Sequence, residues 1–273
     1  MKTLYISDLD GTLLNSDVCI SEFTATTLKR LINEGLLFSY ATARSYTTAG
    51  QLTAGITAHF PVILYNGAVV VDNVTGKPIL TNFFTDQQAW QLADKLVENG
   101  VWPLVYSYDN DVESMTFVKE KSTEPLKEFI YQYEGKIKHN LVQSCDGLKK
   151  ENTFYMVCIG DEEQLYPVYQ QLKEIEWLNI IYQTDLYTGH YWLEIMPRTA
   201  GKDNAIKMLR DMLGCDKLVC FGDGRNDISM FQLCDESWAM GNAVDELKAM
   251  ATGVIDTNNN DGVAKWLLKN WKP

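Results

Sequence analysis

Two carboxylates separated by a single residue stand near the start of the chain, where a short apolar run leads into Asp8-Leu9-Asp10-Gly11-Thr12. If the strand continues through Leu9, side chains alternate between its faces, so Asp8 and Asp10 project to the same side. Two like charges held this close repel each other unless a cation or a shared proton offsets them. Such a pair suits a divalent cation and acid–base chemistry. The alternative is a strand that ends in an Asp–Gly turn, where aspartate is common for backbone reasons.

Further polar residues follow apolar runs elsewhere in the sequence. They are Thr42-Ala43-Arg44 after residues 36–41, the loop Gly222-Asp223-Gly224-Arg225-Asn226-Asp227 after residues 217–221, and Lys202 at the start of a predicted helix. The loop does not match GxGxxG, because Asp227 stands at the third glycine position, and the chain contains no GxxxxGK[ST]. A solvated turn accounts for any one of these residues. Four acids, a threonine and a lysine at coincident strand ends favour one shared site.

The pattern of strands and helices changes twice along the chain. In the first third, buried strands alternate with amphipathic helices, which predicts a parallel sheet with right-handed crossovers. From about Asn82 the strands lack such crossovers, and the alternating pattern returns after Pro197. We therefore expect an α/β fold, a Rossmann-like, doubly wound and mainly parallel sheet over residues 1–81 and 192–273. An α+β cap domain built on an antiparallel sheet is expected over residues 82–191.

The composition narrows the choice of partners. Asp and Glu outnumber Lys and Arg by 36 to 24, which gives a net charge of −12. This balance argues against nucleic acid and against an anionic membrane surface, since both require clustered basic residues. A small anionic substrate stays compatible, because a local cation can reverse the field inside a cleft. The sequence does not reveal the oligomeric state.

The cysteines and the apolar runs indicate the compartment. The six cysteines form no CxxC pair, and several stand inside apolar runs, as expected of reduced buried thiols. The first residues lack the apolar region of a signal peptide. No apolar run approaches the ~18 residues of a spanning helix. We expect a protein of the cytoplasm.

Taken together, these segments resemble the four motifs of the haloacid dehalogenase (HAD) superfamily. The matching residues are Asp8-x-Asp10-Gly11-Thr12, Thr42, Lys202 and the loop 222–227. The large insertion between the second and third motifs resembles the Cof-type phosphatases (type IIB, with a C2-type cap). Asn66-Gly67-Ala68 also resembles a signature of that branch. The similarity extends over essentially the whole chain.

The resemblance implies a role for each matching residue. Asp8 would be the nucleophile that takes the phosphoryl group, and Asp10 would be first the general acid and then the general base. Thr42 would bind a phosphate oxygen, and Lys202 would neutralise charge on the phosphate and on Asp8. Asn226 would contact the substrate or the nucleophile loop.

A metal site is implied as well. Mg²⁺ would be held by Asp8, the backbone carbonyl of Asp10 and Asp223, while Asp227 would bind or orient a metal-bound water. This set fits the habit of Mg²⁺ to keep several waters.

Three more residues are expected on the phosphate or substrate side of the site. Ala43 stands where the family often has glycine, so its methyl group changes the phosphate loop. Arg44 either faces the crevice or anchors an adjacent helix. Asn66 belongs to the signature already named.

The expected function is hydrolysis of a small phosphorylated metabolite by a Mg²⁺-dependent phosphatase through an aspartyl-phosphate. Sugar phosphates come first among the substrates, with pyridoxal phosphate, flavin mononucleotide or a nucleotide as alternatives. A phosphomutase of related fold is a second reading. A metabolite-binding pseudophosphatase that acts as a regulator is a third, although its usual sign, loss of Asp8 or Asp10, is missing from this sequence.

Overall fold

The structure, a computed structural model, describes residues 1–56, 60–109, 112–184 and 188–273. The chain forms two compact units, the core unit (Met1–Leu80 with Gly201–Pro273) and the inserted unit (Thr81–Ala200). The chain leaves the core unit close to the expected residue 81. It returns at Gly201 and not at residue 192, which corrects the predicted boundary. The reason is that β11 (Tyr191–Pro197) pairs with two strands of the inserted unit, so it cannot belong to the core sheet.

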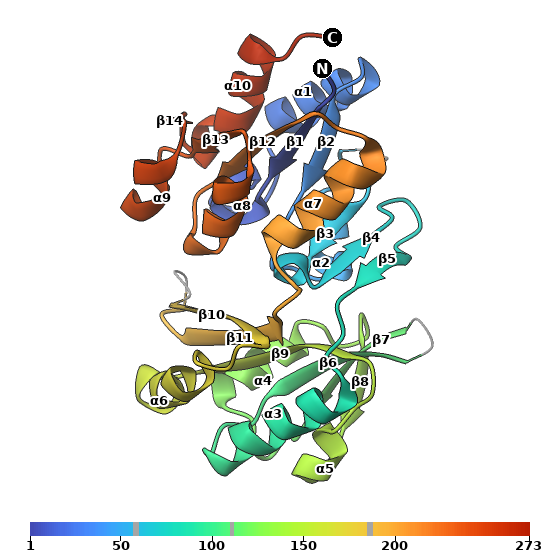
Figure 1. Ribbon diagram of the computed structural model, residues 1–273, viewed down its shortest axis with the longest axis vertical. Coiled ribbons are helices and arrows are strands. Elements are labelled where there is room, and N and C mark those ends of the chain that lie inside the picture. Colours follow the sequence, from blue (N-terminus) through green and yellow to red (C-terminus); the bar gives the residue numbers. More distant parts are fainter. Residues whose placement is uncertain (57–59, 110–111, 185–187) are drawn as a thin grey trace. The chain divides into compact units, whose positions relative to one another are not determined.

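The core unit is built on a parallel sheet (Figure 1). Its strand order is β14 (Gly253–Val254), β13 (Glu236–Ala239), β12 (Lys217–Gly222), β1 (Thr3–Ser7) and β2 (Leu37–Tyr40), and each neighbouring pair is parallel. A single bridge from Ala41 to Ile63 continues the sheet into β3 (Val62–Leu64). β3 opens a small sheet with β4 (Val69–Val71) and β5 (Pro78–Thr81).

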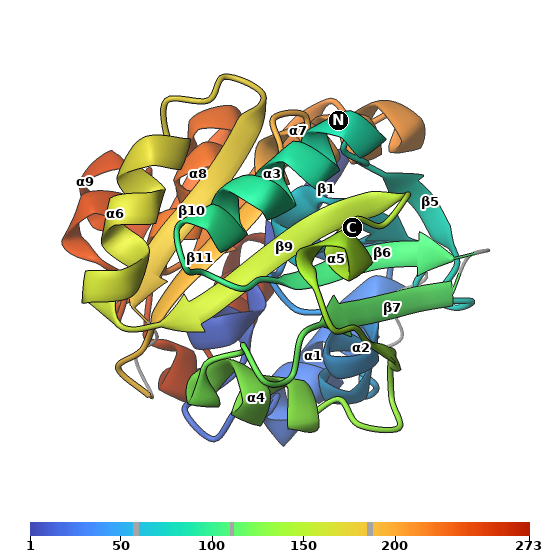
Figure 2. The same cartoon turned by 90° about the horizontal axis from the view of Figure 1, so that it is seen from below.

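Six helices cover the described part of the core sheet. They are α1 (Glu22–Asn33), α2 (Tyr46–Leu52), α7 (Lys202–Leu213), α8 (Ile228–Leu233), α9 (Asp245–Met250) and α10 (Gly262–Asn270). α1 contacts α10, and α7 contacts α8. Figures 1 and 2 show α7 and α8 on one side of β1 and α1 on the other. The doubly wound α/β fold is thereby confirmed.

Local sequence explains where the helices start and stop. Ser21 accepts the N–H of Thr24 at 3.0 Å, and Ser45 accepts the N–H of Thr48, so both serines cap free N–H groups at a helix start. α7 ends at Gly214, whose φ of +62° suits glycine at a helix terminus.

The inserted unit contains a six-stranded sheet in the order β10-β11-β9-β6-β7-β8. Its remaining strands are β6 (Leu104–Asp109), β7 (Val112–Phe117), β8 (Lys138–Leu141), β9 (Thr153–Gly160) and β10 (Leu178–Thr184). All neighbouring pairs are antiparallel except β7 and β8, which are parallel.

Helices α3 (Asp86–Glu98) and α6 (Glu162–Leu172) pack on one face of this sheet and share a hydrophobic core with it (Figure 2). Leu92 and Leu96 of α3, Leu165 and Val168 of α6 and Met156 of β9 all belong to this core. α4 (Glu124–Tyr131) packs against β9. The inserted unit therefore has its own core, as expected of a domain.

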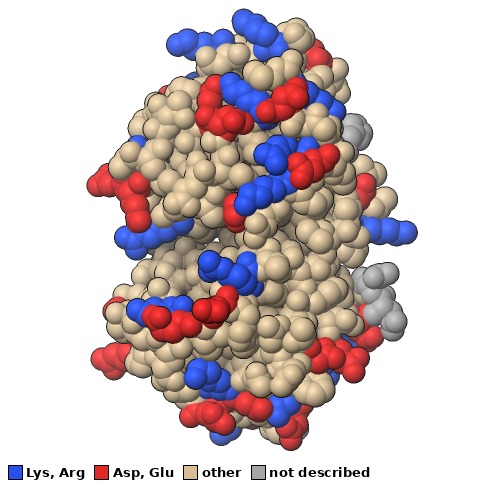
Figure 3. All heavy atoms as spheres, in the orientation of Figure 1, with Lys and Arg blue, Asp and Glu red and all other residues tan. Residues whose placement is uncertain are grey.

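Charged side chains are mixed on the surface in view, where Lys and Arg lie beside Asp and Glu in both units (Figure 3). No helix in the described part of the chain has the length and apolar character that crossing a membrane requires.

Candidate active site

The site begins where the winding of the core sheet reverses. From β1 the chain order runs outward through β2 on one side and through β12, β13 and β14 on the other. Asp8 directly follows β1, and its N–H donates to the carbonyl of Phe221 on β12 at 2.9 Å. Asp223 directly follows β12. Ligands of such sheets bind at this reversal point, beyond the carboxyl ends of the strands.

Residues Leu9–Leu13 form a tight turn, which we call the catalytic turn. It is closed by a hydrogen bond from the N–H of Leu14 to the carbonyl of Leu9 at 2.8 Å. Gly11 has φ +72°, and a Cβ at this position would lie 2.2 Å from Oδ2 of Asp223. Glycine is thus required both by the backbone conformation and by the close approach of the carboxylate. Thr12 fixes that carboxylate by donating from Oγ1 to Oδ1 of Asp223 at 2.8 Å.

Lys202 is the cation at the centre of the site. Its Nζ lies 2.6 Å from Oδ1 of Asp8 and 2.6 Å from Oδ1 of Asp227, and its side chain is only 1% exposed. The α7 helix starts at Lys202, so its side chain is anchored by a rigid element. Charge-assisted hydrogen bonds in a buried setting hold both carboxylates in fixed positions.

A second turn, residues 65–67, packs closely against the backbone just before Lys202. Tyr65, Asn66 and Gly67 all have positive φ, at +50°, +51° and +96°. A Cβ on Gly67 would lie 2.2 Å from the backbone carbonyl carbon of Gly201. A positive φ costs Tyr65 and Asn66 conformational free energy, and backbone strain of this kind is concentrated at functional sites.

Asp227 is fully engaged by protein groups. Its Oδ1 accepts from Lys202, and its Oδ2 accepts the N–H groups of Asp223 at 3.0 Å and Gly224 at 3.1 Å. The carboxylate therefore shapes the loop that carries Asp223.

The donor set fits a divalent cation. Among the described residues, carboxylate oxygens of Asp8, Asp223 and Asp227 lie within 4.8 Å of one another. Hard oxygen donors of this kind suit Mg²⁺. Because both oxygens of Asp227 accept hydrogen bonds from protein groups, Asp8 and Asp223 are the carboxylates that could hold such an ion.

The pKa values of the site residues also favour a bound cation. Burial raises the pKa of Asp8 well above its ordinary value; Lys202 opposes this shift, and the neighbouring carboxylates reinforce it. Burial, then the charge of Asp227, raises the pKa of Asp223 to about 7. Burial disfavours the charge of Lys202, but Asp227 and Asp8 raise its pKa above the ordinary value. One ammonium thus faces three carboxylates, and a further positive charge would stabilise the ionised forms.

Asp10 points to a different partner. Arg44 donates from Nε to Oδ2 of Asp10 at 2.8 Å and from Nη2 to Oδ1 at 2.6 Å. Of the two predicted positions for Arg44, facing the crevice or anchoring an adjacent helix, these bonds to Asp10 support the first. Because the Asp10 side chain is engaged in this way, only its backbone could join the carboxylates of Asp8 and Asp223 around a metal.

The other predicted residues lie in the loops after β2, β3 and β12. Thr42 is buried, and its Oγ1 accepts the N–H of Arg44 at 3.2 Å. Asn66 donates its N–H to the carbonyl of Thr42 at 2.9 Å and accepts at Oδ1 from Nδ2 of Asn226 at 3.2 Å. Ala43 is half-buried between Thr42 and Arg44. The structure thus links Thr42, Asn66 and Asn226 in one network.

One residue of this region was missed at the level of sequence. Nδ2 of Asn242 donates to the carbonyl of Gly11 in the catalytic turn at 2.8 Å. The two residues are separated by 231 positions, and an asparagine after a short strand is typical of any turn. The sequence around Asn242 carries no signal for the contact with Gly11.

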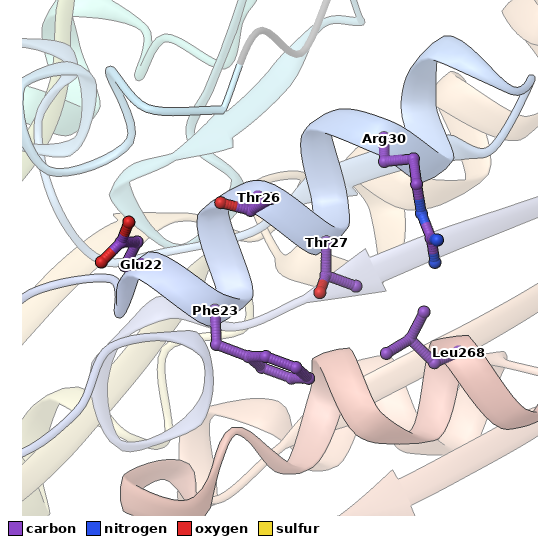
Figure 4. Close-up of a pocket in the computed structure, with 6 residues that line it drawn as sticks. All are labelled: Glu22, Phe23, Thr26, Thr27, Arg30 and Leu268. Carbon is purple, nitrogen blue, oxygen red and sulfur yellow. The ribbon is translucent and has the colours of Figure 1, made fainter.

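A separate groove lies between α1 and α10 in the core unit, with a volume of about 530 Å³ (Figure 4). It is lined by Glu22, Phe23, Thr26, Thr27, Arg30 and Leu268, with Phe23 and Thr27 directed from α1 toward α10. None of the predicted site residues lines it, so it is distinct from the candidate active site.

Comparison with known proteins gives the family. The model of the haloacid dehalogenase-like hydrolases matches residues 5–267. The chain is also similar to the 5-amino-6-(5-phospho-D-ribitylamino)uracil phosphatase YwtE of Bacillus subtilis (strain 168). The two are 29% identical over 289 residues, which cover 98% of this chain and 97% of the relative.

Solved structures share the fold. A haloacid dehalogenase-like hydrolase from Bacteroides thetaiotaomicron superposes with a TM-score of 0.80 at 22% identity, covering 99% of this chain and 100% of the other. The HAD subclass IIB sugar phosphatase BT4131 gives a TM-score of 0.75 at 22% identity, with 98% of each chain covered.

Proposed function

The chain belongs to the haloacid dehalogenase-like hydrolase family, and on that premise we propose that it is a Mg²⁺-dependent phosphatase with Asp8 as its nucleophile. The observation that carries the proposal is the convergence at Asp8 of a buried lysine and a second carboxylate at the reversal point of the sheet. A structural ion pair would need neither the Asp223 carboxylate beside it nor the glycine at position 11 that leaves room for this carboxylate.

In the first half of the reaction, a carboxylate oxygen of Asp8 attacks the phosphorus of a phosphate monoester. The bond from phosphorus to the ester oxygen breaks, and Asp10 gives its proton to that oxygen, so that an alcohol leaves. Lys202 holds Asp8 in place and offsets charge on the phosphoryl oxygens. Thr42 offers its hydroxyl to one of those oxygens.

In the second half, Asp10, now ionised, takes a proton from water as the water oxygen attacks the phosphorus of the aspartyl-phosphate. The bond from phosphorus to Asp8 breaks, and inorganic phosphate leaves. Arg44 donates to both oxygens of Asp10, which suits the ionised carboxylate that takes this proton; for the first half Asp10 must be protonated, and its O–H then replaces one of the two acceptors.

Mg²⁺ would be held by Asp8, Asp223 and the backbone carbonyl of Asp10, with Asp227 fixing the loop that carries Asp223. When bound, the ion supplies positive charge that favours ionised Asp8 and offsets charge on the phosphate. Every proton is moved by Asp10.

The proposed substrates are small phosphorylated metabolites, with phosphates on sugars or sugar alcohols first. Support comes from two relatives, one named for a phospho-ribityl compound and the other a sugar phosphatase. We propose the cytoplasm as the compartment, since all six cysteines are free thiols.

The test is a panel of phosphate monoesters assayed for phosphate release with Mg²⁺. The panel includes sugar phosphates, 5-amino-6-(5-phospho-D-ribitylamino)uracil, pyridoxal phosphate, flavin mononucleotide and nucleotides. We expect steady phosphate release from at least one, and none from Asp8→Asn. A bisphosphate product without phosphate release would favour a phosphomutase, and binding without turnover would favour a regulator.

A further inference from the structure

A short loop after β13 contacts both halves of the candidate metal site. Nδ2 of Asn242 donates to the carbonyl of Gly11 at 2.8 Å, and the N–H of Val244 donates to the carbonyl of Asp223 at 2.9 Å. Gly11 belongs to the catalytic turn, whereas Asp223 belongs to the loop after β12. Residues 242–244 therefore tie together two segments that lie far apart in the sequence.

The amide of Asn242 has a defined orientation. Its Oδ1 accepts the N–H of Asn258 at 3.1 Å. A backbone N–H can only donate and the carbonyl of Gly11 can only accept, so the amide nitrogen must face Gly11. Asn258 adds a second tie, since its Nδ2 donates to the carbonyl of Leu14, the residue that closes the catalytic turn, at 2.9 Å.

The spacing between the two segments is already tight. The Asp223 carboxylate lies against the backbone of Gly11, where no Cβ could fit, and Thr12 donates to the same carboxylate. A displacement of the turn by 1 Å would change the distance from the Asp10 carbonyl to Asp223. Misplacement of that size can cost about 10²-fold in rate.

We propose that Asn242, oriented by Asn258, is a positioning residue that fixes the catalytic turn relative to Asp223. Its effect on catalysis rests on the proposed function, but its effect on the turn does not. Asn242 is itself exposed, so it acts through the carbonyl of Gly11 and does not support the core by packing.

Three variants and one matched control test the proposal. Asn242→Ala removes the bond to Gly11, and Asn242→Asp replaces the donor by an oxygen that repels the Gly11 carbonyl. Asn258→Ala removes the bond to Leu14 but keeps the backbone N–H that orients Asn242. Asn260→Ala is the control, because Asn260 lies near Asn258 and, among the described residues, its Nδ2 donates to Asp256 alone, at 3.0 Å.

The first readout is hydrogen exchange of the metal-free protein, followed by mass spectrometry of peptides that cover residues 9–16. We expect faster exchange in both Asn242 variants, a smaller change in Asn258→Ala and none in Asn260→Ala. Unchanged exchange in Asn242→Ala and Asn242→Asp would overturn the proposal.

The second readout is Mg²⁺ affinity by calorimetry together with kcat and KM. For the Asn242 variants we expect several-fold weaker Mg²⁺ binding and a roughly tenfold lower kcat, with KM changed less than twofold. Faster exchange without weaker Mg²⁺ binding would overturn the positioning role. If the wild-type protein hydrolyses no phosphate ester, the proposed function fails, while exchange and Mg²⁺ affinity still decide whether Asn242 positions the turn.

Discussion

Arg44 donates to both carboxylate oxygens of Asp10, at 2.8 Å from Nε and 2.6 Å from Nη2. The fork of the guanidinium matches the two oxygens of a carboxylate, and a lysine cannot reproduce that geometry. The sequence left two positions open for Arg44, and the structure bonds it to Asp10, the proposed general acid and base.

Replacing Arg44 by Lys is expected to lower kcat by about tenfold, and Arg44→Ala by about 10²-fold, because Asp10 loses its fixed orientation. Steady-state kinetics with the best substrate of the panel measures both. Arg30→Lys is the matched control, since Arg30 pairs with Glu34 on the surface of α1, and its kcat should not change. Equal kcat in Arg44→Lys and wild type would show that Asp10 does not depend on the fork.

Lys202→Met tests the buried cation. Without the ammonium, Asp8 and Asp227 are left as buried carboxylates, so the free energy of unfolding should fall by about 3–5 kcal/mol and activity should vanish. Urea denaturation measures the loss. Lys207→Met, on the same helix with an exposed ion pair to Asp203, is the control and should leave stability nearly unchanged. Adding Asp227→Asn to Lys202→Met should recover part of the stability.

Removal of the metal should abolish activity. We expect chelation by EDTA to stop phosphate release and excess Mg²⁺ to restore it. Asp223→Asn should raise the half-saturating Mg²⁺ concentration by at least tenfold, because one of two available carboxylate ligands is lost. The exposed Asp211 supplies the control variant Asp211→Asn. Full activity in EDTA would contradict the metal site.

Gly35 and Gly67 both have a positive φ, so alanine substitutions at the two positions distinguish the effect of backbone strain from the effect of steric overlap. Gly35 has φ +108° and open space around it, whereas a Cβ on Gly67 would overlap the backbone of Gly201. Gly35→Ala should lower the free energy of unfolding by about 1–2 kcal/mol through strain alone. Gly67→Ala should lower it by clearly more and should also reduce kcat, since Lys202 follows Gly201. Equal losses in thermal unfolding would show that the turn at Gly67 adapts.

The sequence predicted the core unit well because its signals are local. Ser45 before α2 and Gly214 after α7 stand where a cap and a stop are expected, and α7 starts at Lys202 as predicted. The strands before Asp8 and Asp223 are continuous apolar runs, as buried parallel strands must be. Residues that directly follow such strands were therefore placed correctly at one edge of the sheet.

The inserted unit was harder to predict. β8 (Lys138–Leu141) is an edge strand of mixed, largely polar residues, and the four-residue helix α5 (Cys145–Leu148) is too short for a helical period to show. Neither was expected from the sequence. The boundary at residue 192 was set too early: the alternating pattern returns only after Pro197, and the strand from Tyr191 pairs with β9 and β10 of the inserted unit.

Side-chain contacts between segments that are distant in the chain could not be predicted from the sequence. The bonds from Asn242 to Gly11 and from Arg44 to Asp10 depend on how loops of different strands meet. The type of a residue does not by itself indicate which distant residue it contacts.

The most direct test of the account is to trap the phosphoryl group on Asp8. The Asp10→Asn variant is mixed with 4-nitrophenyl phosphate, whose leaving group departs without a proton from Asp10, so that only the second half of the reaction is blocked. The mixture is quenched in acid and reduced with borohydride, which converts an aspartyl-phosphate to an alcohol. Peptide mass spectrometry then locates the reduced residue. The account predicts reduction at residue 8, with no such product from Asp8→Asn. A reduced residue elsewhere, or undiminished phosphate release by Asp8→Asn, would contradict it.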